Sequence, residues 1–173
     1  MAAREALYEP MSFDFDTAQA KVQTFKDAQE DAVTSDITMD AFMQKLAMSE
    51  SSGDPNAEIT LDDGRIFTGL YQFGDTRLSD YRKATGAKFT TAEFIKDAAL
   101  QDKVATWHIA DLDKAIDALG DDAADYDRDG LRAVAHLGGK SGMKKFVQSK
   151  GGYNPADEVG TSLQSYYDKF STS

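Results

Sequence analysis

The chain has no cysteine among its 173 residues, and this absence excludes several kinds of chemistry. Disulfide bonds, thiolate nucleophiles and cysteine-ligated metal sites are unavailable to it. The sequence also has no run of 18 apolar residues that would predict a transmembrane helix, so we expect no membrane insertion. The first ten residues lack the apolar centre of a signal peptide. We therefore expect either export by another route or a leader that has been removed.

Basic residues are also scarce. The sequence carries 19 Lys and Arg against 30 Asp and Glu, which gives a formal net charge of −11 at pH 7. Because contacts to phosphate groups need clustered Lys and Arg, this balance argues against nucleic acid and against an anionic membrane surface as partners. The two histidines, His108 and His136, lack the spacing of metal ligands. We predict neither a metal site nor a cofactor.

The composition that remains is that of a folded domain. Of the residues, 41% are hydrophobic and 28% are charged, which is typical of a soluble globular protein with one core. Residues 1–16 have no sustained periodicity and are expected to form an extended N-terminal arm. Residues 17–173 are expected to form a single domain that begins with a helix from Thr17 to about Val33.

Helical patterns dominate the chain, and one strand pair interrupts them. Glu58–Leu61 and Arg65–Thr68 alternate polar and apolar residues around Asp62-Asp63-Gly64, which predicts a β-hairpin. Helical patterns follow from Asp75 toward Gly86 and after a capping box at Thr90 and Glu93. An apolar stripe from Val104 to Leu119 predicts a long helix with Gly120 as its cap. Further helices are predicted from Leu131 to an interruption at Gly138–Gly142, and from a cap at Thr161 or Ser162 to Phe170. The predicted fold class is α+β, predominantly α-helical, with one small β-hairpin.

An acidic loop precedes the helix at Leu131. Asp125, Asp127 and Asp129 have the opening spacing of an EF-hand calcium loop. The twelfth loop position is His136, where that loop requires a bidentate Glu. A solvated turn that leads into the next helix is therefore the favoured interpretation, and calcium binding is the alternative.

A helix that ends at an acidic residue stands just before the hairpin. Leu46 lies on the apolar face of a helix that begins near Thr38, and Pro55 forces the chain out of helical conformation, so the helix must end between Glu50 and Asp54. Most glutamates in such a position are solvated surface groups. A negative charge near a helix C-terminus is mildly unfavourable, however, and this would raise the pKa of the Glu50 carboxyl.

Two sequence elements resemble a known family. Glu50-Ser-Ser-Gly-Asp-Pro-Asn-Ala57 resembles the Glu-Ser-Gly-Gly-Asn-Pro-Asn-Ala element of soluble lytic transglycosylases and goose-type lysozymes, and Gly69-Leu-Tyr-Gln-Phe73 resembles their Gly-Leu-Met-Gln-Ile element. Ala133-Val-Ala-His-Leu-Gly-Gly139 lies where that family often carries Ala-Tyr-Asn-Ala-Gly, and only its small residues correspond. The resemblance covers roughly residues 38–140. It implies a lysozyme-like fold and cleavage of the β-1,4 bond between N-acetylmuramic acid and N-acetylglucosamine in peptidoglycan.

The resemblance also assigns roles to individual residues. Glu50 would be the catalytic acid that protonates the departing glycosidic oxygen, and this role needs a pKa raised toward neutrality by a poorly solvated pocket. Ser51 or Ser52 would orient the Glu50 carboxylate by hydrogen bonding. His136 lies where related proteins often place Tyr or Asn near the cleft, and Tyr153 stands in a loop that cannot easily bury it. The residues expected to bind substrate are Ser51, Tyr71, Gln72, His136 and Tyr153.

Several of these side chains have a structural alternative. The Gln72 amide would either bind a sugar or position the acid, or it would satisfy the backbone of its own turn. Tyr71 would either stack on a sugar ring or belong to the core, as aromatic residues more often do. His108, on the apolar stripe of the long helix, is expected to be packed rather than catalytic.

A second carboxylate would decide the mechanism. An inverting hydrolase needs one at roughly 6.5–9.5 Å from the acid to activate water. Lytic transglycosylases need none, because the substituents of muramic acid take over and an anhydro-sugar forms. Asp75, Asp62 and Asp63 are candidates, although Asp75 would equally cap the next helix and the other two would make the hairpin turn. We predict a transglycosylase in which Glu50 acts alone. The alternatives are a goose-type-like hydrolase and a noncatalytic cell-wall-binding or virion structural module on the same fold.

The expected partner is the glycan strand of peptidoglycan, and the expected place of action is the periplasm or cell wall. The missing export signal fits an enzyme of a phage-like particle, an effector injected by secretion machinery, or a chain without its leader. We expect a monomer.

Overall fold

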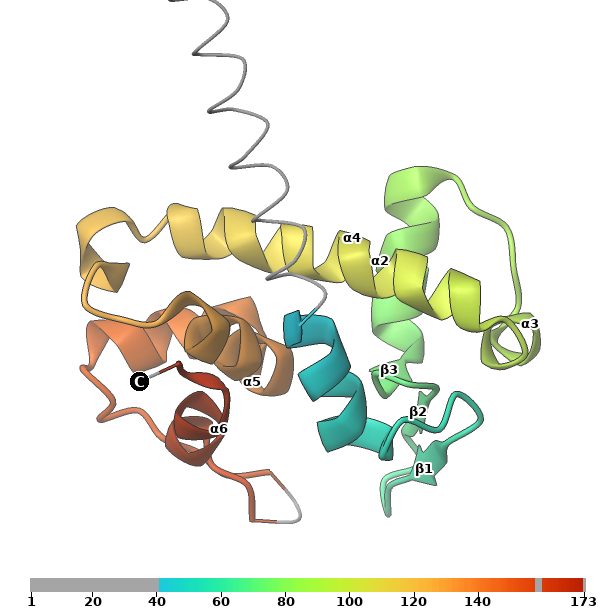
Figure 1. The fold of residues 1–173 in the computed structure, drawn as a ribbon, viewed down its shortest axis with the longest axis horizontal. Helices are drawn as coiled ribbons and strands as arrows, with labels where there is room; N and C mark the ends of the chain where they lie inside the picture. The colour runs from blue at the N-terminus through green and yellow to red at the C-terminus, as the bar shows by residue number, and fades with distance from the viewer. Residues whose placement is uncertain (1–40, 158–159, 173) are drawn as a thin grey trace, which may run out of the picture. The chain divides into compact units, whose positions relative to one another are not determined.

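The computed structural model describes residues 41–157 and 160–172 (Figure 1). The expected N-terminal arm, residues 1–16, and the expected first helix lie outside the described residues. Within the described part, α-helices dominate and are accompanied by one small antiparallel sheet. The predicted α+β, predominantly helical class is confirmed. No helix in this part combines the length and the apolar content that crossing a membrane requires.

The predicted hairpin is present and gains a third strand. Strands β1 (Glu58–Thr60) and β2 (Ile66–Thr68) pair in antiparallel register. The turn between them closes through a backbone hydrogen bond of 2.9 Å from Leu61 N to the Arg65 carbonyl, and Gly64 adopts a φ of 84°, which favours glycine. Strand β3 (Phe73–Gly74) pairs with the other edge of β2, so the sheet order is β1-β2-β3. The sequence pattern did not predict β3 because two residues carry no alternation.

The helices after the sheet have the predicted order. Their bounds are α2 Asp75–Thr85, α3 Thr91–Ile95, α4 Ala98–Asp117, α5 Arg128–Gln148 and α6 Leu163–Phe170, with a short 3-10 helix η1 at Gly120–Ala123. The capping box of Thr90 with Glu93 begins α3, and Ser162 caps α6. Gly86 ends α2 at a φ of 73°. These local signals were read correctly because each involves residues close in sequence.

The core forms between α4, α5, α6 and the helix of residues 41–51. The expected apolar stripe of α4 is buried, with Val104 and Ile109 fully inaccessible and Leu112 2% exposed. Phe42 and Phe170 join the helix of residues 41–51 to α6, with ring centroids 5.5 Å apart. Each buried side chain of this size contributes roughly 1.5–3 kcal/mol. In Figure 1 the helix of residues 41–51 lies between the sheet on one side and α5 with α6 on the other.

Three expectations about the helix boundaries and loops have clear outcomes. The predicted cap at Gly120 was wrong, because α4 ends at Asp117 with Ala118 as its cap, and Gly120 instead begins η1. The predicted interruption of the following helix is confirmed at Gly139, whose φ of 70° and ψ of 168° break α5. In the acidic loop, Asp127 caps α5 by accepting a hydrogen bond from Gly130 N at 2.9 Å. Within residues 41–157 and 160–172, no group of three or more acidic, His or Cys side chains is arranged to hold a metal ion.

Candidate functional site

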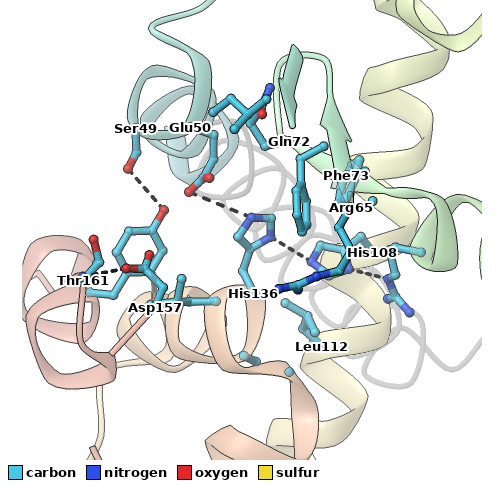
Figure 2. Close-up of a pocket in the computed structure, with 18 of the residues that line it drawn as sticks. Ser49, Glu50, Arg65, Gln72, Phe73, His108, Leu112, His136, Asp157 and Thr161 are labelled. Atoms are coloured by element: carbon cyan, nitrogen blue, oxygen red, sulfur yellow. Dashed lines mark hydrogen bonds and ion pairs between the residues drawn. The ribbon is translucent and has the colours of Figure 1, made fainter. Parts of the chain in front are cut away.

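A cleft of about 1130 Å³ opens beside the C-terminal end of the helix of residues 41–51. Its walls come from that helix, from the hairpin and β3, from α2, α4 and α5, and from residues 156–157 and 161–169. Three of the sequence-predicted site residues, Glu50, Gln72 and His136, line it together. Figure 2 shows the Glu50 carboxyl group pointing toward the His136 ring across this space. These three residues lie up to 86 positions apart in the chain, and the cleft brings them together.

The local sequence explains why Glu50 reaches the cleft. Leu46, one turn before it, is fully buried and fixes the helix against the core. The helix ends at residue 51, within the predicted interval, and Gly53 at a φ of 80° turns the chain away while its N–H donates to the Ala47 carbonyl at 3.2 Å. Ser51 Oγ donates to the Leu70 carbonyl at 2.9 Å. The end of the helix is thus fastened to the segment that leads to Gln72.

The Glu50 carboxyl group is poorly solvated. Its side chain is 20% exposed. Burial is the largest influence and raises the pKa of Glu50 from the ordinary 4.5 to about 7, while the positive charge of Lys169 lowers it and the negative charge of Asp157 raises it. Near neutral pH this carboxyl group therefore exchanges a proton, as a general acid must.

A line of three side chains leads away from Glu50, and Figure 2 labels the first two, His136 and His108. His136 Nε2 lies 3.9 Å from Glu50 Oε1. His108 Nε2 lies 3.1 Å from His136 Nδ1, and Arg77 Nε donates to His108 Nδ1 at 2.8 Å. Phe73 packs edge-on against both imidazole rings, with centroids 5.1 Å from His108 and 6.0 Å from His136. His108 is 6% exposed, so the expected packing of this side chain is confirmed, and the ring also borders the cleft. Its contact with His136 was not foreseen.

Gln72 satisfies its own turn and keeps one atom unpaired. Its Nε2 donates to the Gly69 carbonyl at 2.9 Å and to the Ala57 carbonyl at 3.3 Å, which is the structural alternative expected from the sequence. Its Oε1 is buried and has no hydrogen-bond partner among the described residues. The backbone of Gln72 adopts a φ of 47°, a left-handed conformation that costs a non-glycine residue roughly 1–2 kcal/mol. A buried unpaired acceptor and an unfavourable backbone at one residue are features that cluster at functional sites.

The other residues expected to bind substrate lie elsewhere. Tyr71 is 4% exposed and donates its hydroxyl proton to Asp102 at 2.8 Å, so it belongs to the core, and its expected role is corrected. Ser51 is likewise corrected, because its hydroxyl bonds to backbone carbonyls and does not line the cleft. Tyr153 is 38% exposed, as its loop position predicts, but it lies outside the cleft with Lys145 5.2 Å from its ring centroid.

None of the three candidate second carboxylates lines the cleft. Asp63 makes the hairpin turn, as its structural alternative predicts, by accepting from Arg65 N at 3.0 Å. Asp62 is exposed in the same turn. Asp75 accepts a hydrogen bond from Thr91 at 3.0 Å and is the first residue of α2 rather than its cap, which is Gly74. The structure thus places all three candidate carboxylates outside the lining of the cleft.

Among the charged residues that border the cleft, two that the sequence did not indicate act on the pKa of Glu50. They are Asp157, whose Oδ1 accepts from Thr161 N at 2.7 Å, and Lys169, whose Nζ donates to Ser49 Oγ at 2.6 Å. Both belong to the last 20 residues, which the resemblance does not cover. Lys169 lies on α6, and its place beside the cleft follows only from the packing of α6 against the helix of residues 41–51.

Removing each of these two charges is expected to shift the pKa of Glu50, in opposite directions. Asp157→Asn is expected to lower the pKa of Glu50, because it removes a negative charge that disfavours the carboxylate, and Lys169→Gln is expected to raise it, each on the order of half a pH unit. Titration of the Glu50 side-chain carboxyl by ¹³C NMR measures both shifts. Two shifts of the same sign would contradict this description of the site.

Comparison of the chain with protein-family models, with curated proteins and with solved structures found no match. The functional argument therefore depends on the geometry and chemistry of the cleft.

Proposed function

We propose that this chain is a peptidoglycan-cleaving muramidase with a lysozyme-like fold, and that Glu50 is its catalytic acid. The observation that carries the proposal is the poorly solvated Glu50 carboxyl group, with a pKa of about 7, on the wall of an open cleft. The order of a helix ending in Glu50, a hairpin and Gln72 agrees with the resemblance of those elements to lytic transglycosylases and goose-type lysozymes. The bond cleaved is the β-1,4 link between N-acetylmuramic acid and N-acetylglucosamine.

The chemistry asks little more of the protein than this acid. At pH 6 roughly nine-tenths of the Glu50 carboxyl groups carry a proton, given a pKa of about 7. Glu50 donates this proton to the departing glycosidic oxygen as the bond to the anomeric carbon breaks. The polar atoms around the cleft, including Ser49 Oγ and Tyr166 Oη at 3.2 Å from each other, are suited to the hydroxyl and amide groups of a glycan.

The second step has two possible outcomes. In a lytic transglycosylase, a hydroxyl of the muramic acid itself attacks the anomeric carbon and returns a proton to Glu50, so an anhydro-sugar forms and no water is consumed. This outcome needs no second carboxylate, and the positions of Asp62, Asp63 and Asp75 favour it. One observation keeps hydrolysis as a second candidate, because Asp157 lines the same cleft as Glu50.

The ends of the released fragments distinguish these outcomes. Mass analysis of wild-type digests is expected to show anhydromuramic ends, and Asp157→Asn is expected to keep the cleavage rate within about tenfold, because it removes no catalytic group in this mechanism. Reducing ends, together with a loss of roughly 100-fold or more in the Asp157→Asn variant, would replace the transglycosylase by the hydrolase.

The candidate function outside enzymology is that of a noncatalytic cell-wall-binding module. Such a module sediments with peptidoglycan sacculi and releases no soluble glycan, whereas a muramidase releases fragments continuously. The raised pKa of Glu50 favours the enzyme, because a binding surface gains nothing from an acid that titrates at neutral pH. Cosedimentation without release would support the binding module instead.

The proposed activity implies where the chain acts. The substrate lies outside the cytoplasmic membrane, so we propose action in the periplasm or cell wall, as a component of a phage-like particle or as a protein delivered by secretion machinery. We propose that the chain acts as a monomer, since Glu50, His136 and Lys169 meet within one copy. No cofactor enters the proposed reaction.

A further inference from the structure

We propose that Arg77 and His108 are positioning residues that hold His136 in its Nε2–H tautomer, so that His136 offers Glu50 a hydrogen-bond donor and cannot act as a base toward it. The inference deepens the proposed function, because it depends on Glu50 being the catalytic acid. Of the residues involved, no sequence pattern indicated Arg77, and His108 was expected only to be packed.

The direction of the hydrogen bonds follows from Arg77. The Nε–H of an arginine can only donate, so His108 Nδ1, at 2.8 Å, must be the acceptor. A neutral imidazole whose Nδ1 accepts carries its proton on Nε2, and this proton is donated to His136 Nδ1 at 3.1 Å. His136 Nδ1 is then an acceptor, and its own proton lies on Nε2, the atom that faces Glu50 Oε1 at 3.9 Å. One arginine thus sets the tautomers of both histidines.

Neither ring can take a second proton without losing a hydrogen bond. A proton on His108 Nδ1 would face the Arg77 N–H, and a proton on His136 Nδ1 would face the His108 N–H. Burial and the nearby cations act in the same direction, since they hold the pKa of His108 well below its usual value and lower the pKa of His136 to about 4. Both rings therefore remain neutral at the pH at which Glu50 titrates.

Arg77 is held in place by groups other than His108. Its Nη2 lies 2.6 Å from Asp111 Oδ2, and its guanidinium lies over the Trp107 ring at 4.2 Å from the centroid. Lys140 from α5 reaches the same Asp111 at 3.0 Å. The guanidinium thus has a fixed orientation before any substrate binds. Such an orientation is needed to set the donor-to-acceptor direction of the relay, by which we mean the hydrogen-bonded row Arg77–His108–His136.

The direction of these hydrogen bonds affects the Glu50 carboxyl group. If the relay ran the other way, His136 Nε2 would be a bare acceptor beside Glu50 and would compete with the glycosidic oxygen for the proton. With the inferred direction of these hydrogen bonds, the His136 N–H stabilises the carboxylate that remains after proton transfer. The separation of 3.9 Å exceeds a hydrogen bond, and such contacts in unliganded sites tighten when charge develops. The charges that face Glu50 from other elements are Lys169 on α6 and Asp157 before it.

The test is ¹⁵N NMR of the imidazole nitrogens in the full chain, without substrate. The chain has two histidines, so four nitrogens are observed and assignment needs one variant. At pH 6.5 we expect Nε2 to be protonated and Nδ1 to be bare in both rings. A protonated Nδ1 on His136, alone or together with a protonated Nε2, would overturn the inference.

Two variants of His108 separate the relay from simple packing. In His108→Gln the amide Nε2 replaces the imidazole Nε2 as donor and the amide oxygen accepts from Arg77, so the His136 tautomer and the Glu50 pKa are expected to stay near wild type. In His108→Leu the donor is lost, and we expect an Nδ1–H population on His136 and a Glu50 pKa about one pH unit higher, which moves the pH profile of cleavage with it. Asp80→Asn is the control, because Asp80 lies 3.8 Å from Arg77 on the outer side of α2 and touches neither histidine.

The outcomes distinguish this inference from the proposed function. Wild-type behaviour of His108→Leu in both measurements, or equal behaviour of the Leu and Gln variants, would overturn the relay while leaving cleavage by Glu50 intact. The expected tautomers in a chain that releases no glycan would uphold the relay geometry and reject the muramidase.

Discussion

Replacement of Glu50 by Gln is expected to slow the clearing of a peptidoglycan suspension by roughly 10²–10⁴-fold, the range that a positioned general acid contributes. Gln has nearly the same shape and keeps the helix end in place, but its amide protons are not acidic enough to be transferred to the glycosidic oxygen. The measurement is the initial rate of turbidity loss at pH 6, with circular dichroism to show that the variant is folded.

The wild-type rate should also depend on pH in a defined direction. In the proposed mechanism the protonated form of Glu50 is the active one. Since the pKa of Glu50 is about 7, the rate is then expected to fall as the pH rises through about 7. Glu58→Gln is the matched control, since Glu58 is an exposed residue of β1 outside the cleft. Equal clearing by Glu50→Gln and Glu58→Gln would remove Glu50 from the mechanism.

The same Glu50→Gln substitution is expected to stabilise the fold at alkaline pH. The pKa of Glu50 is raised in the folded state from 4.5 to about 7, so its stabilising contribution is fully present below pH 4.5 and is lost as the pH rises through 7. At pH 8.5 the ionised, poorly solvated carboxylate costs up to about 3 kcal/mol relative to the unfolded chain. Gln carries no charge and avoids this cost.

Urea unfolding at pH 4 and pH 8.5 measures the effect. The free energy of unfolding of Glu50→Gln should be similar to that of wild type at pH 4 and higher at pH 8.5, while Glu58→Gln should show no such gain between the two pH values. A lower free energy of unfolding for Glu50→Gln than for wild type at pH 8.5 would mean that the fold accommodates the Glu50 carboxylate well. This would remove the basis for a raised pKa.

The features that the sequence predicted correctly are local. The helix end at Glu50 follows from Leu46 and Pro55, and the hairpin follows from alternation around Asp63 and Gly64, all within a few residues. Short-range steric and hydrogen-bonding rules act on neighbouring residues, so a single sequence reveals them. Gln72 was linked with Glu50 through the resemblance of the two elements to one family, and both residues line the cleft.

The features that the sequence did not predict depend on packing between distant segments. His108 and His136 are 28 positions apart and meet only because α4 packs against α5. Each histidine alone looks like an isolated polar residue on an apolar face. A signal was nevertheless present, since a buried imidazole needs a hydrogen-bond partner, and two histidines on successive core helices can supply one another.

Charged residues at the cleft show the same limit. A net charge of −11 describes the whole chain and says nothing of its distribution, yet Arg77 and Lys169 both line the cleft. Lys169 reaches Ser49 across 120 positions of sequence because α6 packs against the helix of residues 41–51. The electrostatic environment of Glu50 is therefore a property of the tertiary structure.

The most direct test of the central claim is the rate at which soluble glycan fragments appear when purified chain is incubated with peptidoglycan sacculi at pH 6. If Glu50 is the acid of a muramidase, the wild type and Glu58→Gln release fragments at similar rates and Glu50→Gln releases them at least about 100-fold more slowly. Fragment release by Glu50→Gln at the wild-type rate, or no release by the wild type, would contradict the claim.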